Sequence, residues 1–97
     1  MKSLADTQKL LEEHKPVLMQ KFHVKTLGIF GSYVRGEQTP RSDIDVLVEF
    51  FKPVSFFTFL EFEEHLSQLL GTKVDLVTKK ALKPAIGEAI LKQVQYI

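Results

Sequence analysis

Three short apolar runs restrict the possible folds of this chain more than any other feature. Each is long enough for a β-strand, and the segments between them determine how the strands connect. Val24–Phe30, Ile44–Phe50 and residues 73–77 each have the length and apolar content of a strand. A segment rich in Gly, Ser, Thr and Pro joins the first two, which indicates a loop containing one helical turn. A helix-length segment joins the second and third. The sequence therefore predicts a small three-stranded sheet.

Three further segments carry apolar residues at helical spacing. They are Leu4–Phe22, 55–70 and 84–94. Ser3 followed by Asp6 predicts a capping box, Gly71 predicts a helix end, and Pro16 predicts a kink or a split after His14. The order helix, strand, loop, strand, helix, strand, helix predicts an α+β fold, with the helices packed on one face of the sheet and the other face open.

The overall composition excludes several classes of function. The chain has 97 residues, so we expect one domain over residues 1–97. Lys and Arg number 13 against 12 Asp and Glu, which gives no basic surface for direct binding of nucleic acid. The absence of Cys excludes disulfides and thiolate chemistry. Without a signal peptide or a membrane-spanning run, a cytoplasmic protein is expected.

Two aspartates mark the start of the second strand segment. Asp43 and Asp45 are two residues apart, so both carboxylates project to one side of a strand, with Cα atoms about 7 Å apart. Asp75 should share their face if Val46 and Val74 both turn toward the helices. Carboxylates this close repel one another unless a cation lies between them, and an open oxygen site favours Mg²⁺ beside substrate phosphates. The three acids are candidate ligands of a two-metal phosphoryl-transfer site.

A Gly-Ser pair directly follows the first strand segment. Gly31 lets the backbone approach a ligand closely, exposed N–H groups there can hold phosphate, and the Ser32 hydroxyl adds a donor. One helical turn would bring Arg35 back beside Ser32, where it could meet a triphosphate. Each feature alone has a plain interpretation as turn chemistry or a solvated charge. Their occurrence together, in this order, favours a phosphate site.

The segment GIFGSYVRGEQTPRSDIDVLVEF resembles the motif of the nucleotidyltransferase superfamily with a DNA polymerase beta-like palm. That motif is Gly-Ser, a spacer, Asp-x-Asp with apolar residues after it, and a third acid on a later strand. Ten residues separate Ser32 from Asp43, which matches the minimal nucleotidyltransferase subgroup. The similarity continues through LLGTKVDLVTKKALKP and covers nearly the whole chain. One departure is His23, where relatives often carry Gly, and it concerns helix capping rather than chemistry.

The resemblance implies a polymerase beta-like palm fold with a small mixed sheet, and a role for each acid. Asp43 and Asp45 would ligate the metal ions, expected to be two Mg²⁺. Asp75 would be the third acid, sharing a metal and helping to deprotonate the acceptor hydroxyl.

The resemblance also implies a reaction and a partner. Gly31 and Ser32 would hold ATP, with Arg35 assisting. A hydroxyl would attack the α-phosphorus, which transfers AMP and releases pyrophosphate. Proteins of this subgroup are typically paired with an all-helical HEPN-type RNase toxin, and in some pairs they adenylylate a tyrosine of the toxin. The expected function is therefore that of an antitoxin that neutralises a HEPN-type partner by transferring AMP to one of its hydroxyls, a tyrosine in the first instance.

An alternative function is that of a binding antitoxin that neutralises its partner by contact alone. A small-molecule adenylyltransferase is disfavoured because the palm accounts for the whole chain and leaves no residues for a substrate-binding domain.

An aromatic-rich segment is a candidate surface for binding a partner protein. Phe51, Phe56, Phe57 and Leu60 are surplus to the main helical stripe. They mark either a partner surface or aromatic bulk for a small core.

Overall fold

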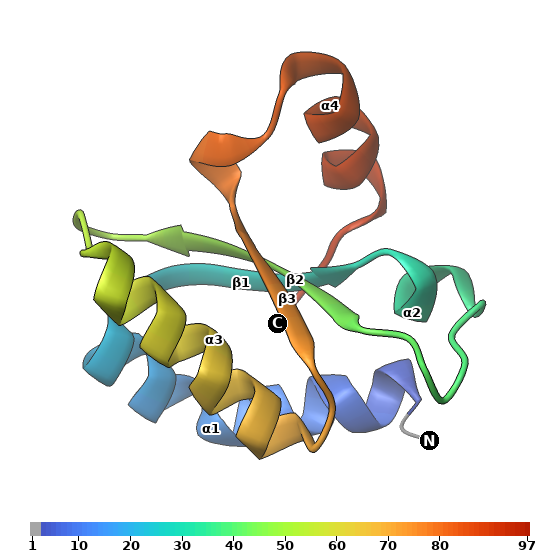
Figure 1. Ribbon diagram of the computed structural model, residues 1–97, viewed down its shortest axis with the longest axis horizontal. Helices are drawn as coiled ribbons and strands as arrows, with labels where there is room; N and C mark the ends of the chain where they lie inside the picture. Colours follow the sequence, from blue (N-terminus) through green and yellow to red (C-terminus); the bar gives the residue numbers. More distant parts are fainter. Residues whose placement is uncertain (1–2) are drawn as a thin grey trace.

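A mixed sheet of four strands organises residues 3–97, the part of the chain that the computed structural model describes (Figure 1). The strands are β1 (Val24–Phe30), β2 (Ile44–Phe50), β3 (Val74–Thr78) and β4 (Gln95–Tyr96). They lie in the order β3-β2-β1-β4, with β1 antiparallel to β2 and β4, and β2 parallel to β3. The three predicted strands are present, and β3 begins one residue later than predicted. β4 was not predicted, because two residues are too few to show a strand periodicity.

Helices lie on both sides of this sheet. They are α1 (Leu4–Phe22), α2 (Ser32–Arg35), α3 (Phe56–Leu70) and α4 (Pro84–Gln93), with a 3₁₀ turn η1 (Lys79–Ala81). Figure 1 shows α1 and α3 packed side by side against one face, while α4 stands on the other side. Within residues 3–97, no helix is both long enough and apolar enough to cross a membrane.

The second face of the sheet is therefore partly covered, where the sequence predicted an open face. Gly28 on β1 makes this possible, since a Cβ there would lie 2.6 Å from Cγ2 of Val94. The absence of a side chain lets the end of α4 and β4 approach β1 closely. Leu47, which alternation places on this face, is only 1% exposed. A face with a buried leucine needs this cover.

The ends of α1 follow from local sequence. The amide N–H of Asp6 donates to Ser3 Oγ at 3.1 Å and the N–H of Ser3 donates to Asp6 Oδ2 at 3.2 Å, so the predicted capping box is confirmed. The helix continues through Pro16 as one element, so the predicted split is wrong. Its C-cap is His23, which has a left-handed backbone (φ 59°, ψ 37°) of the kind that favours glycine.

The core fills the space between the sheet and the α1–α3 layer. Its sheet side comes from alternating apolar residues of β1, β2 and β3, and its helix side includes Phe22 of α1 and Phe62 of α3. The two rings pack with centroids 4.9 Å apart. Full burial of a side chain of this size contributes about 1.5–3 kcal/mol, so this layer stabilises the strands that it packs against.

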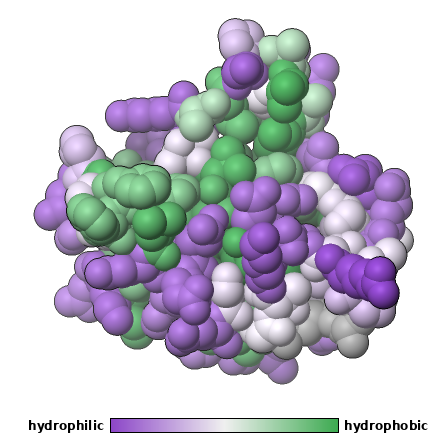
Figure 2. All heavy atoms as spheres, in the orientation of Figure 1, coloured by the Kyte–Doolittle hydropathy of each residue, from purple (hydrophilic) through white to green (hydrophobic). Residues whose placement is uncertain are grey.

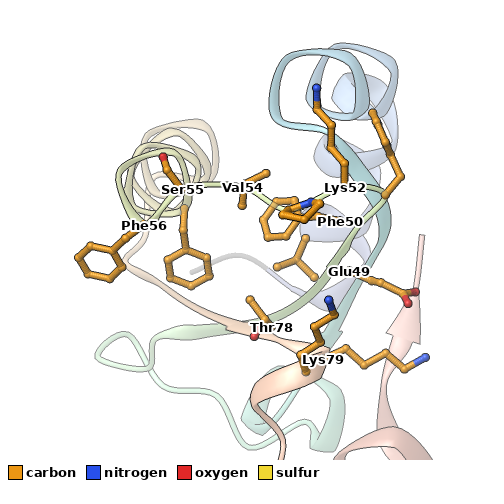
Figure 3. Close-up of a pocket in the computed structure, with 13 residues that line it drawn as sticks. Glu49, Phe50, Lys52, Val54, Ser55, Phe56, Thr78 and Lys79 are labelled. Atoms are coloured by element: carbon orange, nitrogen blue, oxygen red, sulfur yellow. The ribbon is translucent and has the colours of Figure 1, made fainter.

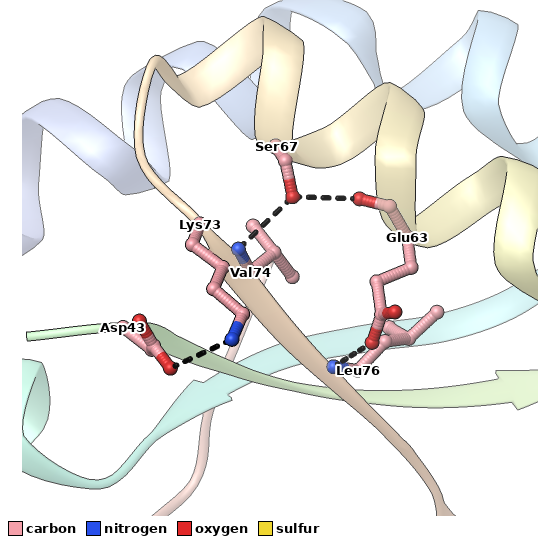
Figure 4. A network of polar contacts seen from close by, with 6 residues as sticks. All are labelled: Asp43, Glu63, Ser67, Lys73, Val74 and Leu76. Carbon is pink, nitrogen blue, oxygen red and sulfur yellow. Dashed lines mark hydrogen bonds and ion pairs between the residues drawn. The ribbon is translucent and has the colours of Figure 1, made fainter.

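The outer edge of β3 is closed by side chains of α3 (Figure 4). The N–H of Val74 donates to Ser67 Oγ at 3.0 Å, and the N–H of Leu76 donates to Glu63 Oε2 at 2.9 Å. The Ser67 hydroxyl in turn donates to the Glu63 carbonyl at 2.9 Å. Edge strands with free N–H groups attract other strands, so these bonds both anchor β3 and protect it.

Replacing Ser67 with alanine should lower the free energy of unfolding by about 1 kcal/mol, because the Val74 amide loses its acceptor. Urea unfolding followed by circular dichroism measures the change. Gln68→Ala is the matched control, since Gln68 is exposed and its side chain, within the described part of the chain, bonds to Glu64 on the same helix. Equal losses in the two variants would show that the α3–β3 bonds contribute no more than helix propensity.

Candidate active site

Asp45 and Asp75 are paired on neighbouring strands near one end of the sheet. They are partners in the parallel register of β2 and β3, and paired strands lie about 4.8 Å apart. The residues on either side of each aspartate are buried. Alternation therefore turns both carboxylates to the face that α1 and α3 leave uncovered. This is the shared placement expected from the sequence.

Gly31 brings the backbone of the Gly-Ser bend against this acid pair. Its dihedral angles, φ 78° and ψ −149°, lie in a region that essentially only glycine adopts. A Cβ at Gly31 would overlap Oδ2 of Asp45 and lie 3.0 Å from its Cγ. After the bend, Tyr33 is 3% exposed and packs in the core, which fixes α2 beside the end of β1. The bend and the acids thus form one site.

The electrostatics of the site show an excess of negative charge. Burial raises the pKa of Asp45, the carboxylates of Asp75 and Asp43 raise it further, and the Arg35 guanidinium opposes them. A group whose charged form is disfavoured in the free protein gains most from a cation or a proton donor. Arg35 therefore lies within electrostatic reach of Asp45.

Asp43 enters the site through a tight turn. The N–H of Ser42 donates to the Thr39 carbonyl at 3.0 Å, and the N–H of Thr39 donates to Ser42 Oγ at 2.8 Å. Asp43 follows this turn, and its Oδ2 lies 3.9 Å from Nζ of Lys73 (Figure 4). Asp43 therefore faces a lysine that directly precedes β3, a partner that the sequence analysis missed because register between strands has no local sequence signal.

The acidic side chains fit a divalent cation, although they do not form a complete set of protein ligands around one. Among the described residues, no three His, Asp or Glu side chains lie close enough to hold a metal ion together. The adjacent carboxylates of Asp45 and Asp75 are hard oxygen ligands that repel each other, which suits Mg²⁺ with several waters retained. Asp43 pairs instead with Lys73, in an exposed ion pair of little energetic weight.

The groups expected to hold phosphate have a protein partner in this structure. The N–H of Gly31 donates to Gln93 Oε1 at 3.0 Å, and Nη1 of Arg35 lies 3.5 Å from the same oxygen. Nε of Arg35 also pairs with Glu37 at 3.4 Å. Gln93 comes from the end of α4, 62 residues after Gly31. No sequence motif pointed to it.

Comparison with known proteins agrees with this geometry. A family model described as a nucleotidyltransferase domain matches residues 11–97. The chain belongs to this nucleotidyltransferase family. The protein adenylyltransferase MntA of Thermococcus cleftensis is 44% identical over 97 residues, which span 100% of this chain and 98% of that relative. The family assignment made from the Gly-Ser and Asp-x-Asp spacing is thereby confirmed.

Solved nucleotidyltransferase structures share the fold. One described as a candidate minimal nucleotidyltransferase has a TM-score of 0.76 and 29% identity, covering 97% of this chain and 98% of that one. Another, a complex of a tri-AMPylated HEPN toxin of Shewanella oneidensis with its MNT antitoxin, has a TM-score of 0.66 and 22% identity, covering 92% and 70%. At that identity the second likeness concerns the fold alone. The predicted polymerase beta-like fold is confirmed.

A separate aromatic surface lies at the other end of β2. Phe51, Phe56, Phe57 and Leu60 are 58%, 69%, 76% and 40% exposed, so they do not serve the core. Figure 2 shows hydrophobic atoms gathered over the start of α3. Phe51 and Phe56 also line a hollow of about 570 Å³, with Lys52, Lys79 and Lys80 around it (Figure 3). An exposed patch of this kind is typical of a protein interface.

Proposed function

We propose that this nucleotidyltransferase is an antitoxin that transfers AMP from ATP to a hydroxyl, in the first instance a tyrosine hydroxyl, of an all-helical HEPN-type toxin. The observation that carries the proposal is the contact of the Gly31 bend with Asp45, which stands in register with Asp75. The name of the Thermococcus cleftensis relative, a protein adenylyltransferase, supports the class of reaction. The Shewanella oneidensis complex supports the class of partner.

Each candidate residue has a part in this reaction. Asp43, Asp45 and Asp75 would hold Mg²⁺, which when bound neutralises charge on the phosphates. The N–H of Gly31 and the hydroxyl of Ser32 would donate to phosphate oxygens, and the guanidinium of Arg35 would oppose their charge. The fixed bend and strand ends orient the nucleotide without moving, and such preorganisation supplies much of catalysis in phosphoryl transfer.

The chemical step is a substitution at phosphorus. The acceptor oxygen forms a bond to the α-phosphorus, and the bond from that phosphorus to the oxygen bridging the β-phosphate breaks. Pyrophosphate leaves with the electron pair of the broken bond. The Asp75 carboxylate, exposed on the open side of the acid pair, would accept the hydroxyl proton. The product is a phosphodiester between AMP and the acceptor.

The aromatic surface supports a protein as the acceptor. It lies near the end of β2, whereas Asp45 lies near its start, about 15–20 Å away at 3.3 Å per residue. A partner docked on this surface could span that distance and present a hydroxyl to the acids. A small metabolite bound at the acids would be too short to contact this surface as well.

Intact mass measurement tests the proposal. The protein is incubated with ATP, Mg²⁺ and an all-helical HEPN-type protein, for which the product of a neighbouring gene is the first candidate. The partner is expected to gain mass in steps of one AMP. Asp43→Ala should abolish the gain. Glu88→Ala is the matched control, because Glu88 is an exposed carboxylate of α4 whose ion pair, among residues 3–97, is with Lys92.

Two other results would contradict transfer. If the partner is neutralised with no gain in mass, the protein acts by contact alone, and the acid cluster is not used. If Asp43→Ala and the wild type add AMP equally, the acids do not carry the reaction.

A further inference from the structure

The side chain of Gln93 accepts hydrogen bonds from groups that are proposed to bind the nucleotide. Its Oε1 accepts from the Gly31 N–H at 3.0 Å and lies 3.5 Å from Nη1 of Arg35. These are two of the three groups proposed to contact the triphosphate. A single amide oxygen thus meets both a backbone N–H and a guanidinium, which is the pair of donors that a phosphate oxygen would use.

Burial makes this acceptor necessary in the free protein. Gly31 is buried and its N–H has limited access to water, so it needs a protein acceptor when no ligand is present. The intrahelical bonds of α2 use the Gly31 carbonyl, which accepts from Val34 and Arg35, and leave its N–H available. Gln93 supplies the missing acceptor.

We propose that Gln93 is a built-in substitute for a nucleotide phosphate oxygen, and that bound nucleotide displaces it. The inference rests on the proposed function, because it assigns the Gly31 N–H and Arg35 to the triphosphate. The phosphate oxygen is charged and the glutamine oxygen is neutral, so the incoming ligand makes the stronger bonds to the same donors. Nucleotide affinity is therefore lowered by the free energy of the bonds that Gln93 must give up.

The position of α4 allows this exchange. Gln93 is its last residue, and α4 lies apart from the α1–α3 layer on the other side of the sheet (Figure 1). Ile86 and Leu91 of α4 are 63% and 42% exposed, so much of the apolar surface of the helix is unpacked. Release of the Gln93 side chain therefore leaves the main core intact.

The test compares nucleotide binding with thermal stability. Gln93→Ala should bind the ATP analogue AMP-PNP with Mg²⁺ about tenfold more tightly by calorimetry, because no neutral hydrogen bonds remain to be broken. Its thermal midpoint without nucleotide should fall, because the Gly31 N–H loses its acceptor. Gln95→Ala, two residues further and exposed on β4, should change neither quantity.

Gln93→Glu keeps an acceptor and serves as the second variant. Its carboxylate should hold the Gly31 N–H and Arg35 more firmly and repel phosphate, so the protein stays folded and AMP-PNP binds about tenfold more weakly.

Opposite or null effects on affinity would overturn the inference. If Gln93→Ala binds AMP-PNP more weakly than the wild type, Gln93 positions the nucleotide instead of substituting for it. If its affinity is unchanged, nucleotide does not displace the side chain. If neither the wild type nor any variant binds AMP-PNP, both the proposed function and this inference fail. If AMP-PNP binds with the same affinity whatever residue stands at position 93, only this inference fails.

Discussion

Replacing Gly31 with alanine is expected to cost about 3 kcal/mol of folding free energy and to weaken nucleotide binding about a hundredfold. The backbone at Gly31 lies in a region closed to other residues, and the new Cβ would overlap Oδ2 of Asp45. Either the bend or the carboxylate must move, and small displacements of catalytic groups have large effects on phosphoryl transfer. Urea unfolding and AMP-PNP calorimetry measure the two losses.

Gly36→Ala is the control for Gly31→Ala. It introduces a side chain at a residue with positive φ, but without the overlap with Asp45. Gly36 ends α2 with φ 71° and ψ 22°, a left-handed conformation that other residues adopt at a cost of about 1 kcal/mol. No atom lies within 4 Å of a Cβ built there. The variant should be slightly less stable and bind nucleotide normally. Similar binding losses in both variants would show that the Gly31–Asp45 contact has no special role.

Asp45→Asn is expected to move activity and stability in opposite directions. AMP transfer should fall on the order of a thousandfold, because a neutral amide no longer completes the acidic site. Stability at pH 7 should rise by about 1 kcal/mol, or roughly 4–8 °C in thermal midpoint, because the repulsion from Asp75 and Asp43 is removed. Water screens part of that repulsion, since Asp45 is only half-buried.

The stability gain should depend on pH in one direction. The pKa of Asp45 is raised above its ordinary value of 3.8 in the folded protein. Between 3.8 and the raised value the folded state binds more protons than the unfolded state, so Asp45 makes stability fall as pH rises through that window. The advantage of Asp45→Asn should therefore be full at pH 7 and vanish below pH 3.8. An advantage that persists in acid would contradict repulsion as its cause.

The strands and long helices were predictable because their signals are local. The alternation around Val46 and the apolar spacing of residues 55–70 each lie within one segment. The cover on the second face was not predictable, since it depends on the close approach of the chain end to Gly28. The split at Pro16 does not occur, because buried residues on both sides hold α1 together across the missing hydrogen bond.

The candidate site was predictable only in part, for a related reason. Strand periodicity places Asp43 and Asp45 on one side, and the family motif adds Asp75. The register that sets Asp45 opposite Asp75 is decided by the whole sheet and its packing on α3. The contact between Gln93 and Gly31 joins positions 62 residues apart through a neutral side chain, which carries no recognisable motif.

The closed edge of β3 limits how another protein can recognise this one. Because Ser67 and Glu63 already occupy the outward amides of Val74 and Leu76, an incoming chain has no backbone ladder to extend there. Recognition at this edge must instead use individual side chains. Such contacts can change one residue at a time without disturbing the sheet, so related chains could differ in the proteins they bind while keeping the same fold.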